Sequence, residues 1–407
     1  MSTTIRVLNQ KRITLGVTGS IAAYKAVAMA SALHQAGAVV DVAMTSDAQR
    51  FVQPLSFQAI THRPVFADLW APGMETDIAH VTLGRESDAI LIAPATAHSL
   101  AKLAHGLADD PVSVTALAAR GPVIVAPAMD AGMYTHTATA QNLEVLRQRA
   151  VVVVEPETGH LASGLLGLGR LANQDTILDV VRATLGAHGD LEGRTIAVTA
   201  GGTQEPIDPV RFITNRASGK MEYALAEAAR DRGAQVVLIT APTALRVPAA
   251  MEVVHLEQAL EMLDALREHY ARLDALIMAA AIADFRVAQP GQHKVKRGSV
   301  EGLSLQLVPN PDLTVETASF PTQRRPVRVG FAAETQDLIA QAQGKLARKS
   351  LDLIVANDVS AGAVFGQDTN QVTLLWADGR QEPLPLLPKT EVAERVLDAV
   401  AALLRDR

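Results

Sequence analysis

Cysteine is absent from this chain of 407 residues. Without a thiol, the protein can form neither a disulfide nor a thiolate metal site, and it has no cysteine nucleophile. Positive net charge is lacking as well, because the formal charge is −6 and the longest basic cluster is residues 294–297. We therefore expect no nucleic-acid partner and no attraction to an anionic membrane. The N-terminal stretch MSTTIRVLNQKR lacks the apolar segment of a secretory signal, which favours a cytoplasmic location.

What the chain does contain is enough apolar sequence, 48% of its residues, for two or three cores. Short β-rich runs alternate with alanine-rich helical stretches, a pattern typical of parallel sheets covered by helices. The pattern stops at a helix near 176–185 and restarts after Gly186-Ala-His-Gly189, so we expect two α/β domains, 1–189 and 190–407. The expected strands are 13–18, 39–44, 89–93, 123–126 and 151–154 in the first domain, and 195–199, 236–240, 275–279, 327–331 and 353–356 in the second.

A glycine-rich stretch, GHLASGLLGLGR at 159–170, has no helical or strand-like period. Glycine tolerates positive φ and costs entropy to order, so such a run is either a linker or a mobile loop that approaches a ligand. The sequence of this stretch does not decide between the two.

The first expected strand leads through Gly19 and Ser20 into a helix, whose amides can hold a phosphate. The G-x-G-x-x-G spacing of dinucleotide folds is missing, and the second strand ends at Thr45-Ser46 rather than at a carboxylate. These hydroxyls suit a mononucleotide or flavin phosphate. A purely structural turn is the alternative.

Two Ala-Pro-Ala turns follow later strands and carry Thr96, Met129 and Asp130 to the carboxyl edge of the sheet, where doubly wound folds bind ligands. His80 is the acid/base candidate beside that edge, with a structural histidine as the alternative.

Together, the segments GSIAAYK, H-x-x-L, PATA and PAM-x-x-x-M in residues 10–175 resemble the homo-oligomeric flavin-containing cysteine decarboxylases. The resemblance implies a flavodoxin-like doubly wound sheet that binds FMN at Gly19, Ser20, Thr45, Ser46, Thr96 and Met129. It also implies that the cysteinyl thiol of 4′-phosphopantothenoylcysteine is oxidised, CO2 is lost, and the returned electrons give 4′-phosphopantetheine. In that family His80 would be catalytic, and residues 155–172 would form a lid over the substrate.

Three positions depart from the family pattern: His98 and Asp130 replace asparagines, and Ser163 replaces the lid cysteine that supplies a proton. A hydroxyl is much less acidic than a thiol, so Ser163 cannot take over that role unchanged. Two accounts remain: an active variant in which Asp130, Ser163 or water carries the proton, or a domain that binds flavin without decarboxylating.

The second domain places Gly201-Gly202-Thr and Ser218-Gly219-Lys220 after its first strand, and these backbone amides, hydroxyls and the ammonium suit phosphate. Walker A spacing is absent, so a P-loop kinase is not expected. Lys345 and Lys349 share a helix face and can reach one polyphosphate, or they are ordinary surface lysines.

The order GGT, ITNRxSGKM, AAAIADF, HKVKR, NPD, GFAAET and LxRKxLDLIVANDVS resembles phosphopantothenate-cysteine ligase over residues 190–407. The resemblance implies a Rossmann-like domain that couples CTP with 4′-phosphopantothenate, aided by Mg²⁺, before L-cysteine attacks the acyl-cytidylate. Lys294 would face the phosphate charge and Asn215 the acyl-phosphate. Glu222 replaces a family glycine, and its charge either weakens phosphate binding or lies outward on the helix. The implied nucleotide and substrate residues are Gly201, Gly202, Ser218, Gly219, Lys220, Ala280, Asp284, Asn310, Asp312, Phe331, Lys345 and Lys349.

The whole chain thus resembles the bifunctional proteins of coenzyme A biosynthesis. A ligase with a silent flavin domain and a flavin-binding scaffold are the alternatives. The families imply trimeric flavin domains and dimeric ligase domains, most simply combined in a dodecamer.

Overall fold

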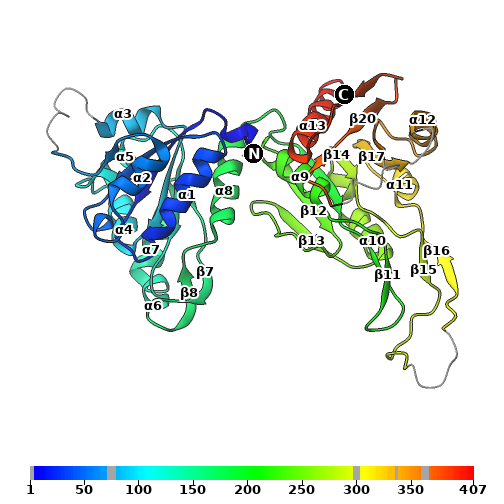
Figure 1. Cartoon of the computed structure of the whole chain (residues 1–407), viewed down its shortest axis with the longest axis horizontal. Helices are drawn as coiled ribbons and strands as arrows, with labels where there is room; N and C mark the ends of the chain where they lie inside the picture. The colour runs from blue at the N-terminus through cyan, green and yellow to red at the C-terminus, as the bar shows by residue number, and fades with distance from the viewer. Residues whose placement is uncertain (1–3, 71–78, 297–302, 335–337, 359–365) are drawn as a thin grey trace. The chain divides into compact units, whose positions relative to one another are not determined.

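The computed structural model of the chain describes residues 4–70, 79–296, 303–334, 338–358 and 366–407 (Figure 1). The chain forms two compact units, Met1–Gly186 and Ala187–Arg407. The ends of three sequence motifs, at Arg297, at Thr335 and at 359–360, lie outside the described residues.

The first unit contains a six-stranded sheet in the order β3-β2-β1-β4-β5-β6, with parallel pairing throughout. Without the two-residue edge strand β3, this is the 2-1-3-4-5 order of flavodoxin-like folds, which confirms the predicted fold class. The strands are β1 (Arg12–Val17), β2 (Val39–Met44), β3 (Val65–Phe66), β4 (Ala89–Ala95), β5 (Val123–Pro127) and β6 (Val152–Val153).

Helices cover both faces of this sheet because its strands are apolar on both sides. Helices α1, α2 and α8 pack on one face, and α4, α5 and α7 on the other. The helices are α1 (Ala23–Gln35), α2 (Pro54–Thr61), α3 (Ala79–Glu86), α4 (Ala97–His105), α5 (Pro111–Leu117), α6 (Ala131–Tyr134), α7 (Thr137–Gln148) and α8 (Gln174–Gly186).

The glycine-rich stretch is neither a linker nor an irregular loop. It forms an antiparallel hairpin of β7 (Glu157–His160) and β8 (Leu166–Arg170), which we call the lid hairpin. The sequence interpretation missed these strands because glycine, rather than a polar residue, alternates with leucine in β8. This Leu-Gly-Leu-Gly alternation was the available signal.

The second unit contains an eight-stranded sheet in the order β13-β12-β9-β14-β17-β18-β20-β21. The first six strands are parallel in the Rossmann order 3-2-1-4-5-6, as expected, whereas β20 and β21 add an antiparallel edge that the sequence interpretation did not include. The strands are β9 (Thr195–Ala200), β12 (Gln235–Thr240), β13 (Glu252–His255), β14 (Ala275–Met278), β17 (Val327–Glu334), β18 (Leu353–Asp358), β20 (Val372–Trp376) and β21 (Gln381–Pro383).

In the described part of the second unit, three two-stranded ribbons accompany this sheet, and the β15–β16 ribbon extends away from it (Figure 1). The ribbons are β10 (Gln204–Pro206) with β11 (Phe212–Thr214), β15 (Phe285–Val287) with β16 (Leu307–Pro309), and β19 (Thr369–Asn370) with β22 (Leu387–Pro388).

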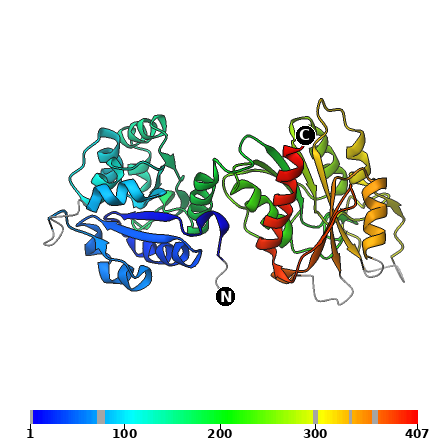
Figure 2. The ribbon, with the colours of Figure 1, turned by 90° about the horizontal axis from the view of Figure 1, so that it is seen from above.

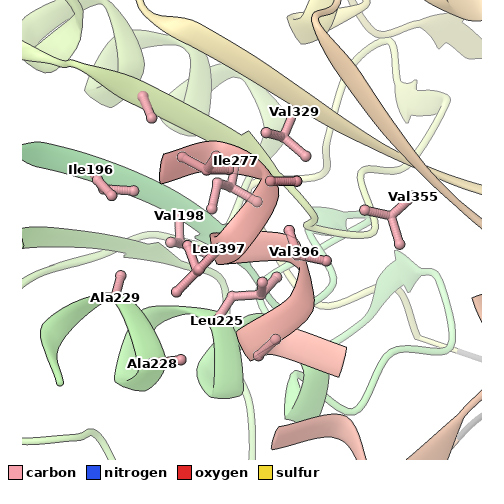
Figure 3. Close-up of a cluster of buried hydrophobic side chains, with 14 of the residues drawn as sticks. Ile196, Val198, Leu225, Ala228, Ala229, Ile277, Val329, Val355, Val396 and Leu397 are labelled. Carbon is pink, nitrogen blue, oxygen red and sulfur yellow. The ribbon is translucent and has the colours of Figure 1, made fainter. Parts of the chain in front are cut away.

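The largest core of the second unit lies between its sheet and two helices, α9 and α13. Leu225 of α9 and Leu397 of α13 pack with the strand residue Val198 in this core (Figure 3). Helix α13 is the red helix in Figure 2. Helices α10 and α12 pack in other clusters. The helices are α9 (Lys220–Arg230), α10 (Ala259–His269), α11 (Leu313–Glu316), α12 (Leu338–Arg348) and α13 (Lys389–Arg405).

Among the described residues, none of the helices combines the length and the apolar character needed to span a bilayer.

Candidate active sites

The turn after β1 lies against the turn after β2. A Cβ added to Gly19 would lie 2.4 Å from Asp47 Cβ, so only glycine permits this approach. The contact brings Ser20 toward the turn that carries Thr45 and Ser46, at the carboxyl edge of the sheet. Four of the predicted flavin residues therefore belong to two neighbouring turns.

These two turns keep donors available for an anion. In the described part of the chain, no backbone bond uses the amides of Gly19, Ile21 or Ser46. The Thr45 hydroxyl accepts from Ala48 N at 3.2 Å and keeps its own hydrogen for a ligand. The residues thus fit a flavin phosphate at the first turn.

Thr96, which the sequence predicts to bind FMN, also caps a helix. Its side chain caps α4 by accepting from Ser99 N at 3.2 Å, and its amide donates to Thr18 Oγ1 at 3.1 Å. The Thr18 hydroxyl in turn donates to Pro94 O at 2.7 Å, which ties the ends of β1 and β4 together.

Asp130 and Ser163, two of the departures from the family pattern, are in direct contact. The Ser163 hydroxyl donates to Asp130 Oδ2 at 2.8 Å, and Gly132 N donates to Oδ1 at 3.0 Å. The Ser163 bond, followed by that of Gly132, holds the pKa of Asp130 below its usual value. The carboxylate is therefore ionised near neutral pH.

The lid hairpin docks on this same turn. Met129 N donates to Gly169 O at 3.0 Å, and Gly169 has φ +143°. A Cβ at Gly169 would lie 2.3 Å from Met129 O, and one at Gly167 would lie 2.7 Å from Ala131 Cβ. These two glycines allow β8 to contact the turn that carries Asp130, which answers why the stretch is rich in glycine.

Two histidines of the first unit lie apart from this pair. His80 is half-buried in the first turn of α3, directly after residues 71–78, which lie outside the described part. No contact between described residues places His80 beside Asp130 or Ser163. His98 is exposed in the first turn of α4.

In the second unit, seven of the predicted nucleotide residues line one cavity of about 230 Å³, which we call the nucleotide cavity. It lies at the carboxyl end of β14 and along the middle of β17, and β14 is one of the two strands between which the strand order reverses. The seven residues are Ala280, Asp284, Asn310, Asp312, Phe331, Lys345 and Lys349.

An ion pair joins the two sides of the nucleotide cavity. Lys349 Nζ lies 2.8 Å from Asp312 Oδ2, and the other carboxylate oxygen of Asp312 caps α11. Burial opposes the charged carboxylate, but Lys349 and the α11 amides outweigh burial, so the pKa of Asp312 lies below its usual value.

Arg328 on β17 is a buried residue next to the nucleotide cavity that the sequence interpretation did not include. Its fully buried guanidinium donates to Lys349 O at 2.9 Å and to Ser350 O at 3.1 Å, and it also contacts Thr314 O. It therefore fixes the backbone on both sides of the nucleotide cavity. An arginine inside a β-strand was the available signal.

Two buried threonines position the loop after β14. Thr199 Oγ1 accepts from the amides of Ala279 and Ala280 at 3.1 and 3.2 Å, and Thr203 Oγ1 accepts from Ala283 N at 2.9 Å. The Ala280 amide is therefore committed within the protein rather than available for a phosphate.

The glycines before this loop serve close packing. Gly201 has φ +76°, and Gly202 forms a parallel bridge with Ala281. Gly219, with φ +75°, precedes α9, and a Cβ there would lie 2.8 Å from Thr243 Cγ2.

A neighbouring cavity of about 220 Å³ shares Ala280 and Phe331 with the nucleotide cavity and is lined by Ser218, Glu222 and Lys389. Glu222 does not lie outward on α9, contrary to one of the two expectations, because it is only 9% exposed. Burial raises its pKa, and burial lowers the pKa of Lys389. Each charge partly offsets the burial effect at the other.

Lys220 and Asn215 are held by the protein itself. Lys220 Nζ lies 2.7 Å from Asp368 Oδ1 and donates to Gly366 O at 2.8 Å. Asn215 Nδ2 donates to Ile282 O at 2.9 Å, and Ile282 lines the nucleotide cavity.

Lys294 is the one predicted catalytic residue of the second unit that no described contact joins to either cavity. It is exposed in the segment between β15 and β16. The adjacent Val295 N donates to Asp208 Oδ2 at 3.1 Å, which anchors this segment beside the β10–β11 ribbon.

The fold and these sites define a two-domain α/β protein that joins a parallel flavoprotein sheet to a mixed sheet with a cavity at the end of β14. Residues 1–186 match the Flavoprotein family model, and residues 191–404 match that of the DNA/pantothenate metabolism flavoprotein C-terminal domain. The chain belongs to the CoaBC family of bifunctional coenzyme A biosynthesis proteins.

Relatives cover nearly the whole chain. The Bacillus subtilis coenzyme A biosynthesis bifunctional protein CoaBC is 44% identical over 400 residues, or 97% of this chain and 98% of that protein. The Escherichia coli K12 protein of the same description is 42% identical over 393 residues, or 96% of each chain. A crystal structure of the C-terminal domain of a CoaBC protein is 37% identical with a TM-score of 0.46, covering 54% of this chain and 100% of that one.

Proposed function

We propose that the chain catalyses two successive steps of coenzyme A biosynthesis: the CTP-dependent ligation of L-cysteine to 4′-phosphopantothenate, and the FMN-dependent decarboxylation of the product to 4′-phosphopantetheine. The observation that carries this proposal is the match to bifunctional relatives over 97% of the chain, which includes both units.

The ligase step is assigned to the nucleotide cavity and its neighbour. Lys345 and Lys349 lie where they can bind the CTP phosphates, with Lys349 exchanging Asp312 for a phosphate oxygen. Negative charge grows on the phosphates as the acyl-cytidylate forms, so cations placed there lower the barrier. Lys294 reaches the same charge only if its segment moves, and Asn215 would orient the acyl-phosphate.

Mg²⁺ is proposed to arrive with CTP. It commonly keeps several waters and binds through substrate phosphates rather than through an all-protein cage. The cavity that holds Glu222 and Lys389 adjoins the nucleotide cavity, so it is our proposed location for the 4′-phosphopantothenate arm. Its charged lining residues are Arg216, Glu222 and Lys389, so two basic groups and one acidic group face this arm.

The decarboxylation step is assigned to the two turns and the lid hairpin of the first unit. Gly19, Ser20, Thr45 and Ser46 would hold FMN, together with Thr96 and Met129, and the flavin supplies an acceptor for the electrons of the substrate thiol. His80 would act on the substrate rather than on the cofactor.

The contact between Asp130 and Ser163 suggests how a hydroxyl does the work of a thiol. An ionised Asp130 cannot supply a proton, and it would repel the substrate carboxylate. It can accept the hydrogen of Ser163, which holds the hydroxyl oxygen in place to bind a proton-carrying water. We therefore propose that Ser163 and a lid water deliver the proton after CO2 loss.

The test incubates the FMN-loaded chain with 4′-phosphopantothenoylcysteine and follows CO2 and 4′-phosphopantetheine by mass spectrometry. His80→Asn should abolish CO2 release while FMN stays bound. Ser163→Ala should release CO2 and accumulate the oxidised enethiol. If wild-type chain releases no CO2 while its ligase works, the first unit is a silent flavin domain.

The proposed assembly is a dodecamer of trimeric flavin units and dimeric ligase units, acting in the cytoplasm. A monomeric mass in light scattering would contradict the assembly.

A further inference from the structure

A cavity of the first unit lies beside the base of the lid hairpin. Its volume is about 280 Å³, and it is bounded by the start of α1, the base of the lid hairpin and the start of α8. The charged side chains that line it are Lys25, Glu157 and Arg170. None of them belongs to the Asp130–Ser163 pair, and the proposed reaction leaves all three without a role.

Two cations converge on this cavity without a partner. Within the described ranges, neither Lys25 nor Arg170 takes part in an ion pair or a side-chain hydrogen bond. Burial and the charge of Arg170 hold the pKa of Lys25 below its usual value, and Glu157 only partly opposes this. Glu157 is itself engaged, because its Oε1 accepts from Asn173 N at 2.8 Å. Two cations and one carboxylate line the cavity, so it keeps a net positive charge.

Two helices add to this positive potential. Lys25 is the third residue of α1, and Asn173 directly precedes α8, and each helix has 13 residues. The N-terminal ends of both helices, where the helix dipole is positive, thus border the cavity. Two solvated surface cations would point away from each other. Lys25 and Arg170 instead line one concave surface, where their positive charges repel each other. An anion bound between them would remove that repulsion.

We propose that this cavity binds a phosphomonoester group, with Lys25 and Arg170 as its two cationic ligands. A phosphate dianion matches two cations better than a carboxylate does, and guanidinium binds phosphate oxygens in a bidentate manner. The phosphate of 4′-phosphopantothenoylcysteine is the source that we assign, and this assignment rests on the proposed decarboxylase function. Free phosphate is the other source.

The position of Arg170 links this anion to the lid. Arg170 and Glu157 face each other across the base of the lid hairpin, and Gly169 is the residue that accepts from Met129 N. An anion held by Arg170 therefore ties the base of the hairpin to α1 and favours its docked position. Phosphate binding would then promote closure of the lid over the reacting end of the substrate.

The binding test uses the full FMN-loaded chain and inorganic phosphate as the probe, followed by calorimetry. Lys25→Met and Arg170→Gln should each weaken phosphate binding by about 10-fold or more, as expected for the loss of a charge-assisted bond. Arg149→Gln, an exposed cation after α7, is the matched control and should not change binding. The flavin spectrum should be the same in all variants. Unchanged phosphate binding in both site variants would overturn the proposal.

The kinetic test compares 4′-phosphopantothenoylcysteine with its dephosphorylated form. Both site variants should lose about 10-fold in kcat/KM for the phosphorylated substrate and nothing for the dephosphorylated one. If phosphate binding weakens but both substrates are affected alike, the site belongs to free phosphate and the substrate assignment is wrong. If the wild-type chain releases no CO2, the proposed function fails, and calorimetry still decides whether the anion site exists.

Discussion

At the scale of single residues, Asp130 and Ser163 are best understood as one unit. Each departs from its family position, and each by itself suits the reaction poorly. When the two are in contact, the Asp130 carboxylate accepts the hydrogen of the Ser163 hydroxyl, so the two departures are compatible with each other. The sequence interpretation named both residues but could not predict their bond, because it depends on how the lid hairpin docks.

Removing the Ser163 hydroxyl should change the titration of Asp130. The Ser163 bond is the largest cause of the lowered pKa, so Ser163→Ala should raise it toward the usual 3.8. A carboxyl group with a lowered pKa in the folded state stabilises the fold at any pH above its pKa in the unfolded state. This stabilisation is lost as the pH falls through the pKa of the folded state. In the variant, this pH-dependent stabilisation should therefore be smaller, because the folded and unfolded pKa values of Asp130 lie closer together. Carboxyl NMR titration measures the shift, and an unchanged Asp130 pKa would mean that the bond does not form in solution.

Lys294 offers the sharpest test in the ligase half. Lys294→Gln should slow acyl-cytidylate formation by roughly two to three orders of magnitude and leave CTP binding measurable, because the lysine acts on charge that develops in the transition state. Lys296→Gln, also exposed in the same segment, is the control and should have a small effect. Single-turnover pyrophosphate release gives the rate, and normal turnover in Lys294→Gln at saturating substrate would remove this residue from the mechanism.

At the scale of elements, most of the fold could be predicted. The parallel strands are buried runs of apolar residues, and the glycine turns after β1 and β9 mark the carboxyl edges of both sheets. The lid strands were missed because their pattern alternates leucine with glycine. The β20–β21 edge was missed because neither strand was expected: β21 is only three residues, Gln-Glu-Pro, and β20 does not follow the strand–helix alternation of the parallel strands.

The lid hairpin provides a matched pair of variants. Gly169→Ala should abolish docking on the Met129 turn, because alanine would combine an unfavourable φ of +143° with a Cβ 2.3 Å from Met129 O. Gly164→Ala has a φ of +83° but meets no atom within 4 Å, so it should cost only about 1 kcal/mol of backbone strain. We expect decarboxylation to be lost in Gly169→Ala alone, with FMN retained in both. Equal activities would contradict the docked lid.

Arg328 tests how the strand beneath the nucleotide cavity supports it. Arg328→Met leaves the Lys349 carbonyl without its donor and removes one donor each from the carbonyls of Thr314 and Ser350, which should destabilise the second unit by about 3 kcal/mol. Urea unfolding in a Trp70→Phe background, where Trp376 is the only tryptophan left, reports on this unit. Arg324→Met, on the surface, should change stability by less than about 0.5 kcal/mol. A similar small effect at Arg328 would show that the buried network is dispensable.

At the scale of the whole molecule, the two units fit a simple chemical order. The product of the ligase is the substrate of the decarboxylase, so one chain carries both steps. Sequence motifs, together with the helical spacing of Lys345 and Lys349, predicted seven residues that line the nucleotide cavity. They could not predict the position of Lys294, because a residue in a segment outside the sheet is not placed by the strand pattern.

The central claim is that one chain performs both reactions, and one coupled measurement tests it. The purified FMN-loaded chain is supplied with CTP, Mg²⁺, 4′-phosphopantothenate and L-cysteine carrying ¹³C in its carboxyl group. The account predicts that pyrophosphate forms first and that ¹³CO2 and 4′-phosphopantetheine then form in equal amounts. None of the three products should form when CTP is omitted. Pyrophosphate and 4′-phosphopantothenoylcysteine that accumulate without any ¹³CO2 would contradict it.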